Sequence, residues 1–483
     1  MQVQFSKRKI LLPALILHLL CALFSLGFAH PDEHFQIIEF LNMKLGGISP
    51  DSLPWDFQEQ IRSWSQPFLY YPFLKFFEFF NLTNPYFLST TMRILSTLLG
   101  FFSLNFLAFT YLKEIRATQF QKCLLWMGNF LWFIPYIHAR TSSENLSASF
   151  FILGLTLVIY FRNEFSRKVP MEFCAGFLMG LAFLMRYQMG IPLFFLLLWP
   201  LFFDRDGFFR SLTIGLGVAL ALGLGVLIDF WGYGEWVFVP WNYLKVNLLE
   251  GKAAQFGVEP WWYYFKAILV KGVPPISLFL MLGTLVFWRR RWRHPITWVT
   301  LSFFVVHMVI GHKELRFLNF IFLLAPLMAA DTLNFLFNEN TFDKGITWIT
   351  KNLLWFVNGV LLLFMSFKPA HTPLLIYSHL YHNNATGQII YVLDEGSRPS
   401  LEFELKFYLQ NGQRAIKIDF SEFQAQPRGY LLTSTYKQYL ELLPSKQCHV
   451  DYSTYPQWLF AYNYGNWLER SSIWILWDCQ GKN

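Results

Sequence analysis

The chain has few charged residues for its length. Only 14% of its 483 residues are charged, whereas 54% are hydrophobic, and a soluble domain usually carries about 25% charged residues. The few charged residues are distributed among several long apolar stretches. This composition excludes an ordinary soluble domain and indicates a multi-pass membrane protein that has lipid as the solvent for most of its length.

The sequence also lacks internal repeats and low-complexity segments. Many transporters show a two-fold repeat and carry ionisable groups near the middle of the membrane. Here the unusual charges cluster at one face, so a transporter or flippase is kept only as an alternative of another class.

The formal net charge of +8 does not indicate a nucleic-acid partner. The basic residues lie in short clusters between apolar runs, such as 7–9 and 289–293. Basic clusters in short loops are the positive-inside signature of membrane topology. The charge therefore predicts orientation in a membrane rather than phosphate binding along DNA or RNA.

A single threading of the chain accounts for the basic clusters. With residues 7–9 in the cytoplasm, the basic segments 113–122, 162–168, 204–210 and 288–294 also fall inside. The N-terminal run is expected to be an uncleaved first span, because cleavage near Ala29 would leave residues 30–33 as a frayed terminus; a cleavable signal peptide is the alternative. The predicted outer segments are the loop 30–87, the turn near Arg140, 231–261, 312–316 and the tail. About 11 apolar runs approach spanning length: 9–29, 88–112, 123–138, 144–161, 172–188, 190–203, 211–230, 262–287, 296–311, 317–337 and 345–366.

Polar residues return in the C-terminal tail. Short apolar strands at 389–393 and 473–477 and a helical stretch at 401–410 predict a small α/β domain on the non-cytoplasmic side. Its only cysteines, Cys448 and Cys479, either form a disulfide, as an oxidising compartment favours, or remain two thiols in a small core. We therefore predict a transmembrane domain over 1–370 and an extracytoplasmic domain over 371–483.

The string His30-Pro31-Asp32-Glu33-His34 directly follows the first span. Carboxylates are costly close to a bilayer, so Asp32 and Glu33 suggest a functional site. A solvated start of the loop is the alternative. A metal site is a third interpretation, but the spacing matches no zinc signature.

A second polar string, Gly311-His312-Lys313-Glu314-Leu315-Arg316, separates two apolar runs. Lys313 and Arg316 are three residues apart, so on a helical turn they share a face. Positive charge on this side opposes the positive-inside bias, so a topological role fits poorly. The string suits an anionic phosphate held at the membrane surface, with arginine as the fork-shaped donor.

Further polar positions fall on the same predicted side. Arg140 opens the turn Arg-Thr-Ser-Ser-Glu-Asn, where Ser142 or Ser143 is also suited to cap the next helix, with Glu144 in its first turn. Arg186 ends a span, where snorkelling explains it equally well. The outer loop 229–261 is rich in aromatic residues and contains Asp229, Tyr233 and Asn247. Aromatic and amide groups suit sugars, but an interface belt predicts the same composition.

Together these strings resemble the mannosyltransferases of glycosyltransferase family 22, in order and spacing, over about residues 9–330. The resemblance implies a GT-C fold, a polyprenyl (dolichyl-type) phosphate mannose donor and a lipid-linked glycan acceptor, as in GPI-anchor biosynthesis. It implies no metal cofactor, and a location in the endoplasmic reticulum membrane or, in a bacterium, the inner membrane. Its basis is His30 to Gln36, Arg140-Thr141, the segment from Asp229 through Tyr233-Gly234-Glu235-Trp236 to Asn247 and Trp261, and His312 to Phe317.

The resemblance also suggests a role for each string. Asp32 is expected to be the general base of an inverting displacement, with Glu33 orienting the acceptor or sharing that role. A different GT-C glycosyltransferase, acting on protein or lipid A, is the alternative within the class. The residues expected to neutralise the departing lipid phosphate are His312, Lys313, Arg316 and Arg140, and those expected to bind substrate are Asp229, Tyr233, Asn247 and Glu314.

Overall fold

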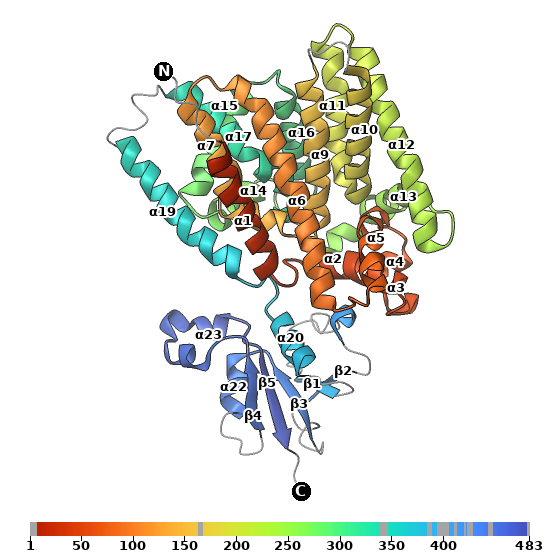
Figure 1. The fold of residues 1–483 in the computed structure, drawn as a ribbon, viewed down its shortest axis with the longest axis vertical. Helices are drawn as coiled ribbons and strands as arrows, with labels where there is room; N and C mark the ends of the chain where they lie inside the picture. Colours follow the sequence, from red (N-terminus) through yellow and green to blue (C-terminus); the bar gives the residue numbers. More distant parts are fainter. Residues whose placement is uncertain are drawn as a thin grey trace. The chain divides into compact units, whose positions relative to one another are not determined.

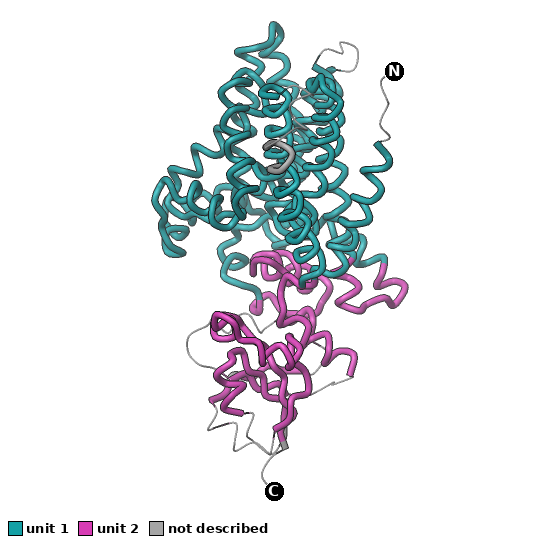
Figure 2. Tube along the Cα trace, turned by 90° about the vertical axis from the view of Figure 1, so that its left-hand side faces the viewer, with its two compact units in different colours: residues 1–25, 53–76, 91–368 teal, residues 26–52, 77–90, 369–483 magenta. Residues whose placement is uncertain are grey.

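A computed structural model describes residues 7–162, 168–337, 346–383, 389–393, 405–409, 413–419, 422, 428–442 and 448–480. The chain forms two compact units, each made of segments that are distant in sequence (Figure 2). Unit 1 comprises residues 1–25, 53–76 and 91–368, and unit 2 comprises residues 26–52, 77–90 and 369–483. Unit 2 therefore combines the predicted C-terminal domain with two segments from the predicted first loop.

Unit 1 is helical (Figure 1). The boundary between the units falls within α5 and α6, so each of these helices has residues in both units. The helices of unit 1 are α1 (Arg8–Phe24), α4 (Trp55–Gln58), α5 (Ser65–Phe79), α6 (Pro85–Tyr111), α7 (Thr118–Phe130), α8 (Phe133–His138), α9 (Ser143–Tyr160), α10 (Lys168–Met185), α11 (Gly190–Phe203), α12 (Gly207–Tyr233), α13 (Val239–Leu244), α14 (Tyr263–Lys271), α15 (Ile276–Arg290), α16 (Pro295–Val309), α17 (Asn319–Leu336) and α19 (Ile346–Phe367).

Many of these helices are suited to lipid. Within the described ranges, five are long and apolar enough to cross a membrane: α6, α9, α10, α12 and the helix over Leu315–Leu336. Shorter apolar helices cover Tyr187–Phe203, Pro295–Val309 and Lys351–Phe367. The prediction of a multi-pass α-helical membrane protein is confirmed.

Two of the predicted apolar runs are broken, and proline explains both breaks. Pro135 would clash with the Leu131 carbonyl of a continuous helix, and the run 123–138 divides at Leu131 into α7 and α8. Asn358 of α19 holds the broken ends, because its Oδ1 accepts the Trp132 amide at 3.0 Å and its Nδ2 donates to the Phe130 carbonyl at 2.7 Å. In the same way the run 262–287 divides into α14 and α15 at Pro274-Pro275.

Close packing of α10 between α9 and α12 depends on residues without side chains. A Cβ atom at Gly176 of α10 would collide with the Ile214 carbonyl of α12, and one at Gly217 of α12 would collide with the Phe173 carbonyl of α10. In lipid, helices gain stability from such close approach because the hydrophobic effect does not drive them together. Small residues in both helices therefore fix this part of the bundle.

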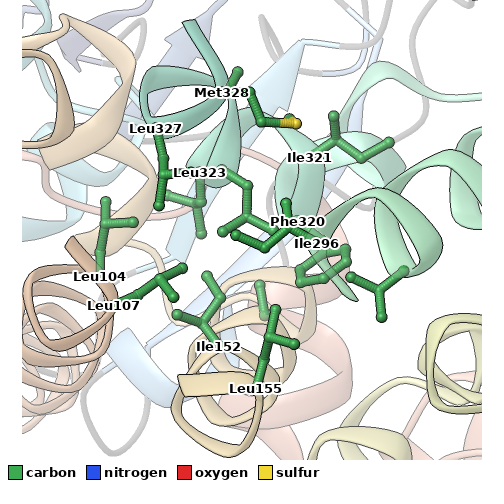
Figure 3. Packing of buried hydrophobic residues seen from close by; sticks show 14 of the residues in the cluster. Leu104, Leu107, Ile152, Leu155, Ile296, Phe320, Ile321, Leu323, Leu327 and Met328 are labelled. Atoms are coloured by element: carbon green, nitrogen blue, oxygen red, sulfur yellow. The ribbon is translucent and has the colours of Figure 1, made fainter. Parts of the chain in front are cut away.

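The core of unit 1 includes residues of α6, α9 and α17. Figure 3 shows Leu104 and Leu107 of α6, Ile152 and Leu155 of α9, and Phe320 of α17 pointing toward one another. All are at most 4% exposed.

Unit 2 contains a five-stranded mixed sheet in the order β2-β1-β3-β5-β4. β1 is parallel to β2 and β3, whereas β5 is antiparallel to β3 and β4. Its core centres on Leu431, Ile475 and Trp477, which are almost fully buried. The elements of unit 2 are α2 (Pro31–Glu33), α3 (Glu39–Lys44), α20 (Leu374–His382), β1 (Ile389–Leu393), β2 (Arg414–Ile418), β3 (Arg428–Thr433), α22 (Tyr436–Leu442), β4 (Cys448–Ser453), α23 (Trp467–Arg470) and β5 (Ile475–Gln480).

The predicted small α/β domain is confirmed, with differences in detail. The strand predicted at 389–393 is β1, whereas the one predicted at 473–477 begins at Ile475 and continues to Gln480. Of the helical stretch predicted at 401–410, residues 401–404 and 410 lie outside the described residues, and Lys406–Tyr408 form a single 3-10 turn. Cys448 of β4 and Cys479 of β5 form a disulfide.

Candidate active site

Polar residues that the sequence did not single out connect the predicted polar strings of unit 1. Gln66, at the start of α5, donates to the Thr141 carbonyl at 2.6 Å and so joins α5 to the Arg-Thr turn. Gln188, just after α10, donates to the Tyr243 hydroxyl of α13 at 2.9 Å. We call the connected residues 60–66, 140–145, 186–188, 229–247 and 312–317 the polar cluster of unit 1.

Arg316 contacts two carboxylates of this cluster. Its Nε and Nη2 donate to the two oxygens of Glu314 at 2.6 and 3.1 Å. Its Nη1 lies 2.8 Å from Oε1 of Glu144, at the start of α9. The predicted phosphate-binding string is therefore tied to the Arg-Thr turn by an arginine whose side chain is 18% exposed.

His312 and Lys313 of the same string have different surroundings. His312 contacts Glu314 through Nε2 at 3.2 Å and the Gly257 carbonyl through Nδ1 at 3.1 Å. The Lys313 ammonium donates to backbone carbonyls, of Glu259 at 2.8 Å and of Ile310. Burial lowers the pKa of Lys313, and Glu259 partly opposes this shift. In this structure Lys313 holds two loops together, and its phosphate-binding role stays a prediction.

Arg140 is buried at the C-terminal end of α1. Its Nη2 donates to the carbonyl of Ser25, the C-cap residue of α1, at 2.7 Å, and its guanidinium lies 5.0 Å from the centre of the Tyr136 ring. A cation is favourable there because the last carbonyls of a helix carry partial negative charge. The capping interpretation of the same turn is confirmed, since Ser142 Oγ accepts the Asn145 amide at 3.2 Å.

Glu144 is a functional candidate that sequence reasoning missed. The sequence suggested only a first-turn acid of α9, but the side chain is 3% exposed and contacts two guanidiniums, of Arg316 and of Arg186. Arg186 Nη1 lies 3.0 Å from Glu144 Oε1. A carboxylate that begins an apolar run is costly without a cationic partner, and that cost was the available signal.

Asp229 and Tyr233 of α12 anchor the segment that precedes α5. Asp229 Oδ1 accepts the Trp64 amide at 2.7 Å and the Ser63 hydroxyl at 2.9 Å. The Tyr233 hydroxyl donates to the Arg62 carbonyl at 2.7 Å. Both groups therefore have structural hydrogen bonds in this structure, and their predicted contacts with substrate stay a prediction.

Asn247, also predicted to bind substrate, lies beyond α13 in a π-helical turn over Lys245–Leu249. Its Nδ2 donates to the Tyr243 carbonyl at 3.2 Å. The residue is only partly buried, so its amide can reach solvent. Glu314, the remaining residue in the predicted substrate set, is the carboxylate that Arg316 and His312 share.

The acidic pair Asp32–Glu33 belongs to unit 2 and forms the short helix α2. His30 begins this helix, and its Nδ1 accepts the Asp32 amide at 3.2 Å. Glu33 is 2% exposed and accepts the Ala29 amide at 3.0 Å, whereas the Asp32 side chain is 28% exposed. The two neighbouring carboxylates thus differ, since Asp32 is accessible and Glu33 is buried.

A buried ion pair supports this turn within unit 2. His34 Nε2 lies 2.7 Å from Glu39 Oε1, which also accepts the backbone amide of Phe407 at 3.0 Å. Glu39 Oε2 accepts a hydrogen bond from the side-chain Nδ2 of Asn42 at 2.9 Å. Burial alone would raise the pKa of Glu39, but His34, Asn42 and the Phe407 amide outweigh it and hold that pKa below its ordinary value. The pair fixes the chain directly after Asp32.

The expected meeting of the acidic string with the cationic string involves both units and stays a prediction. In the described parts of the chain, no group of three or more histidine, cysteine or acidic side chains has the arrangement of a metal site. The expectation that no metal is needed also stays a prediction.

Sequence comparison gives the chain its relatives. The model of a family described as the Alg9-like mannosyltransferase family matches residues 9–396. The chain is 27% identical over 304 residues to GPI alpha-1,2-mannosyltransferase 3 of Danio rerio, covering 62% of this chain and 54% of that protein. It is 28% identical over 319 residues to mannosyltransferase APTG1 of Arabidopsis thaliana, covering 65% and 56%. The chain thus spans about half the length of the curated relatives it matches.

Structural comparison gives the fold. The crystal structure of ArnT from Cupriavidus metallidurans bound to undecaprenyl phosphate matches with a TM-score of 0.54 at 12% identity, over 98% of both chains. The Archaeoglobus fulgidus oligosaccharyltransferase matches with a TM-score of 0.50 at 12% identity, over 90% of this chain and 70% of that one. The predicted GT-C fold is confirmed.

Proposed function

Because this chain belongs to the Alg9-like mannosyltransferase family, we propose that it transfers mannose from a polyprenyl (dolichyl-type) phosphate to a lipid-linked glycan. The GPI mannosyltransferases among its relatives support a GPI-precursor-like acceptor. The undecaprenyl phosphate bound to ArnT supports a polyprenyl phosphate donor. The reaction would take place on the non-cytoplasmic face, in the endoplasmic reticulum of a eukaryote or the inner membrane of a bacterium.

The accessibility of Asp32 beside the buried Glu33 is the observation that carries the mechanism. A general base must reach the hydroxyl that it deprotonates. Asp32 meets that condition with a partly exposed carboxylate, whereas the buried Glu33 accepts the backbone amide of Ala29. We therefore assign the base to Asp32 and the support of its turn to Glu33.

In the proposed step, an acceptor hydroxyl oxygen attacks the anomeric carbon of mannose and its proton passes to Asp32. The bond from that carbon to the phosphate oxygen breaks, and its electron pair remains on the lipid phosphate. A β-linked donor gives an α-mannoside in this single inversion. Arg316, with His312 and Lys313, would stabilise the negative charge that grows on the phosphate.

The test uses purified full-length protein, labelled polyprenyl-phosphate mannose and a panel of lipid-linked glycans, protein acceptors and lipid A. We expect an α-mannosylated lipid-linked glycan from wild type. Base catalysis contributes about 100- to 10,000-fold, so Asp32→Asn should lose transfer by that factor. Glu250→Gln is the matched control, because its carboxylate lies in an exposed pair with Lys245. Transfer only to protein or lipid A, or none at all, would overturn the proposal.

A further inference from the structure

Arg186 has the properties of a ligand-binding guanidinium rather than a snorkelling one. Its side chain is 7% exposed, so it does not extend into solvent. It lies directly after α10, and its Nη1 contacts Glu144 at 3.0 Å and the Ser143 hydroxyl at 3.1 Å. A snorkelling arginine would place its charged end in water.

Part of this guanidinium remains available. Arginine carries five N–H donors in a planar fork. The Nη1 group of Arg186 is occupied, whereas among the described residues its Nε and Nη2 have no hydrogen-bond acceptor. Unused donors on a largely buried cation can be accepted by an anion, and such charge-assisted hydrogen bonds are stronger than neutral ones.

Arg186 and Arg316 share two neighbours, although they are far apart in sequence. Both Nη1 atoms lie within 3.0 Å of Glu144 Oε1. Both guanidiniums also lie over the Phe317 ring, at 4.9 Å for Arg186 and 5.4 Å for Arg316. Two guanidiniums this close repel each other, and the shared carboxylate offsets that repulsion.

This geometry suits an anion with several acceptor oxygens. Paired arginines recognise phosphate through parallel N–H donors, which a lysine cannot reproduce. Lys313, by contrast, directs its ammonium at backbone carbonyls. Arg186 is therefore better placed than Lys313 to act beside Arg316.

We propose that Arg186 binds the phosphate of the polyprenyl donor beside Arg316, and that Glu144 and Phe317 position the two guanidiniums. The assignment rests on the proposed function for the identity of the donor. Glu144 acts through the arginines and does not itself touch the phosphate. The pair distinguishes a phosphate-bearing lipid from a neutral one.

The experiment measures binding of polyprenyl phosphate to purified full-length variants, together with kcat and KM for the mannose donor. Residues that support or extend a charged site contribute about 10- to 100-fold, as outer-shell partners do at metal sites. Arg186→Gln should weaken polyprenyl-phosphate binding and raise the donor KM by that factor. Arg186→Lys, which keeps the charge without the fork, should fall between Arg186→Gln and wild type.

Glu144 is tested through its dependence on the arginines. Glu144→Gln should weaken phosphate binding, and Glu144→Asp should restore part of it. In the double variant Glu144→Gln/Arg186→Gln the two losses should not add, because residues of one network are coupled. Additive losses would show that Glu144 does not act through Arg186.

A second buried pair in the same unit provides the control. Arg210 of α12 lies 2.5 Å from Glu172 of α10, and both side chains are at most 3% exposed. Arg210→Gln should lower the thermal midpoint and leave polyprenyl-phosphate binding unchanged. If Arg186→Gln behaves in the same way, Arg186 is structural and the proposal is wrong. If Arg186→Gln does not fold, wild-type binding and KM in Arg186→Lys would also overturn it.

The outcomes separate this proposal from the proposed function. Lack of mannose transfer by wild type would overturn the function, and a loss of polyprenyl-phosphate binding in Arg186→Gln would still support the site. Mannose transfer by wild type with unchanged binding in Arg186→Gln would overturn the site alone.

Discussion

Asp32 and Glu33 are adjacent in sequence, but their surroundings in the structure are different. Asp32 is partly exposed, whereas Glu33 is buried and accepts a hydrogen bond from the Ala29 backbone amide. Glu33→Gln keeps an oxygen for that amide, so we expect it to transfer mannose far faster than Asp32→Asn. Glu33→Ala removes the acceptor, and an unsatisfied buried donor costs about 1–3 kcal/mol, so its thermal midpoint should fall.

The measurement is transfer rate and thermal midpoint for the variants at these two positions, in one detergent. Equal loss of transfer in Glu33→Gln and Asp32→Asn would show that the two carboxylates share the role of base. A slow but thermally stable Asp32→Asn together with an active Glu33→Gln supports the assignment.

The sequence could predict some of these residues and not others. Arg316 and Asp32 were identifiable because charges are rare near apolar runs. Glu144 carried one signal, the cost of a carboxylate at the start of an apolar run. Its two arginine partners were not identifiable, because they are 42 and 172 positions away in the chain. Partners at that separation follow from tertiary packing and not from local pattern.

At the scale of elements, the contact of α10 with α12 depends on glycine. A side chain at Gly217 would collide with the backbone of α10 at Phe173, whereas a Cβ at Gly215 of the same helix has open space around it. Overpacking costs about 1–3 kcal/mol, so Gly217→Leu should lower the thermal midpoint and Gly215→Leu should not. Equal midpoints for the two variants would contradict the packing described here.

The turn after Asp32 should depend on pH through Glu39. Folding lowers the pKa of Glu39 below its ordinary value of 4.5. A carboxyl whose pKa is lowered contributes stability that is fully present above its ordinary pKa and is lost as pH falls through the folded-state pKa. The ionised Glu39 carboxylate should therefore stabilise unit 2 above its ordinary pKa, and this contribution should be lost as the pH falls into the acid range.

The measurement is the difference in thermal midpoint between wild type and Glu39→Gln. It should be present above about pH 4.5, the ordinary pKa of Glu39, and decrease as the pH falls below that value. A difference that stays constant across this range would show that the charge of Glu39 does not contribute.

The long apolar helices of unit 1 could be predicted from apolar length alone, since each predicted run corresponds to helix in the structure. The breaks within two of these runs could not be predicted from apolar length. The division of 123–138 follows from the clash of Pro135 with the Leu131 carbonyl, which a count of apolar residues ignores. The association of residues 26–52 with the C-terminal sheet in unit 2 depends on long-range contacts such as Glu39 with Phe407.

For the whole molecule, the proposed topology places the loop at 204–206 and the C-terminal sheet on opposite sides of the membrane. Arg205 and Lys437 are both exposed. In a background without Cys174, Arg205→Cys and Lys437→Cys should react with an impermeant maleimide from opposite sides of sealed, oriented vesicles. Detergent should make both reactive. Labelling of both from one side would contradict the topology.

The measurement that tests the central claim most directly separates donor binding from transfer in Asp32→Asn and Arg316→Gln. With labelled polyprenyl-phosphate mannose, Asp32→Asn should bind the donor with near wild-type affinity and transfer about 100- to 10,000-fold more slowly. Arg316→Gln should lose donor affinity. Near-normal turnover by Asp32→Asn, or unchanged donor affinity in Arg316→Gln, would contradict the account.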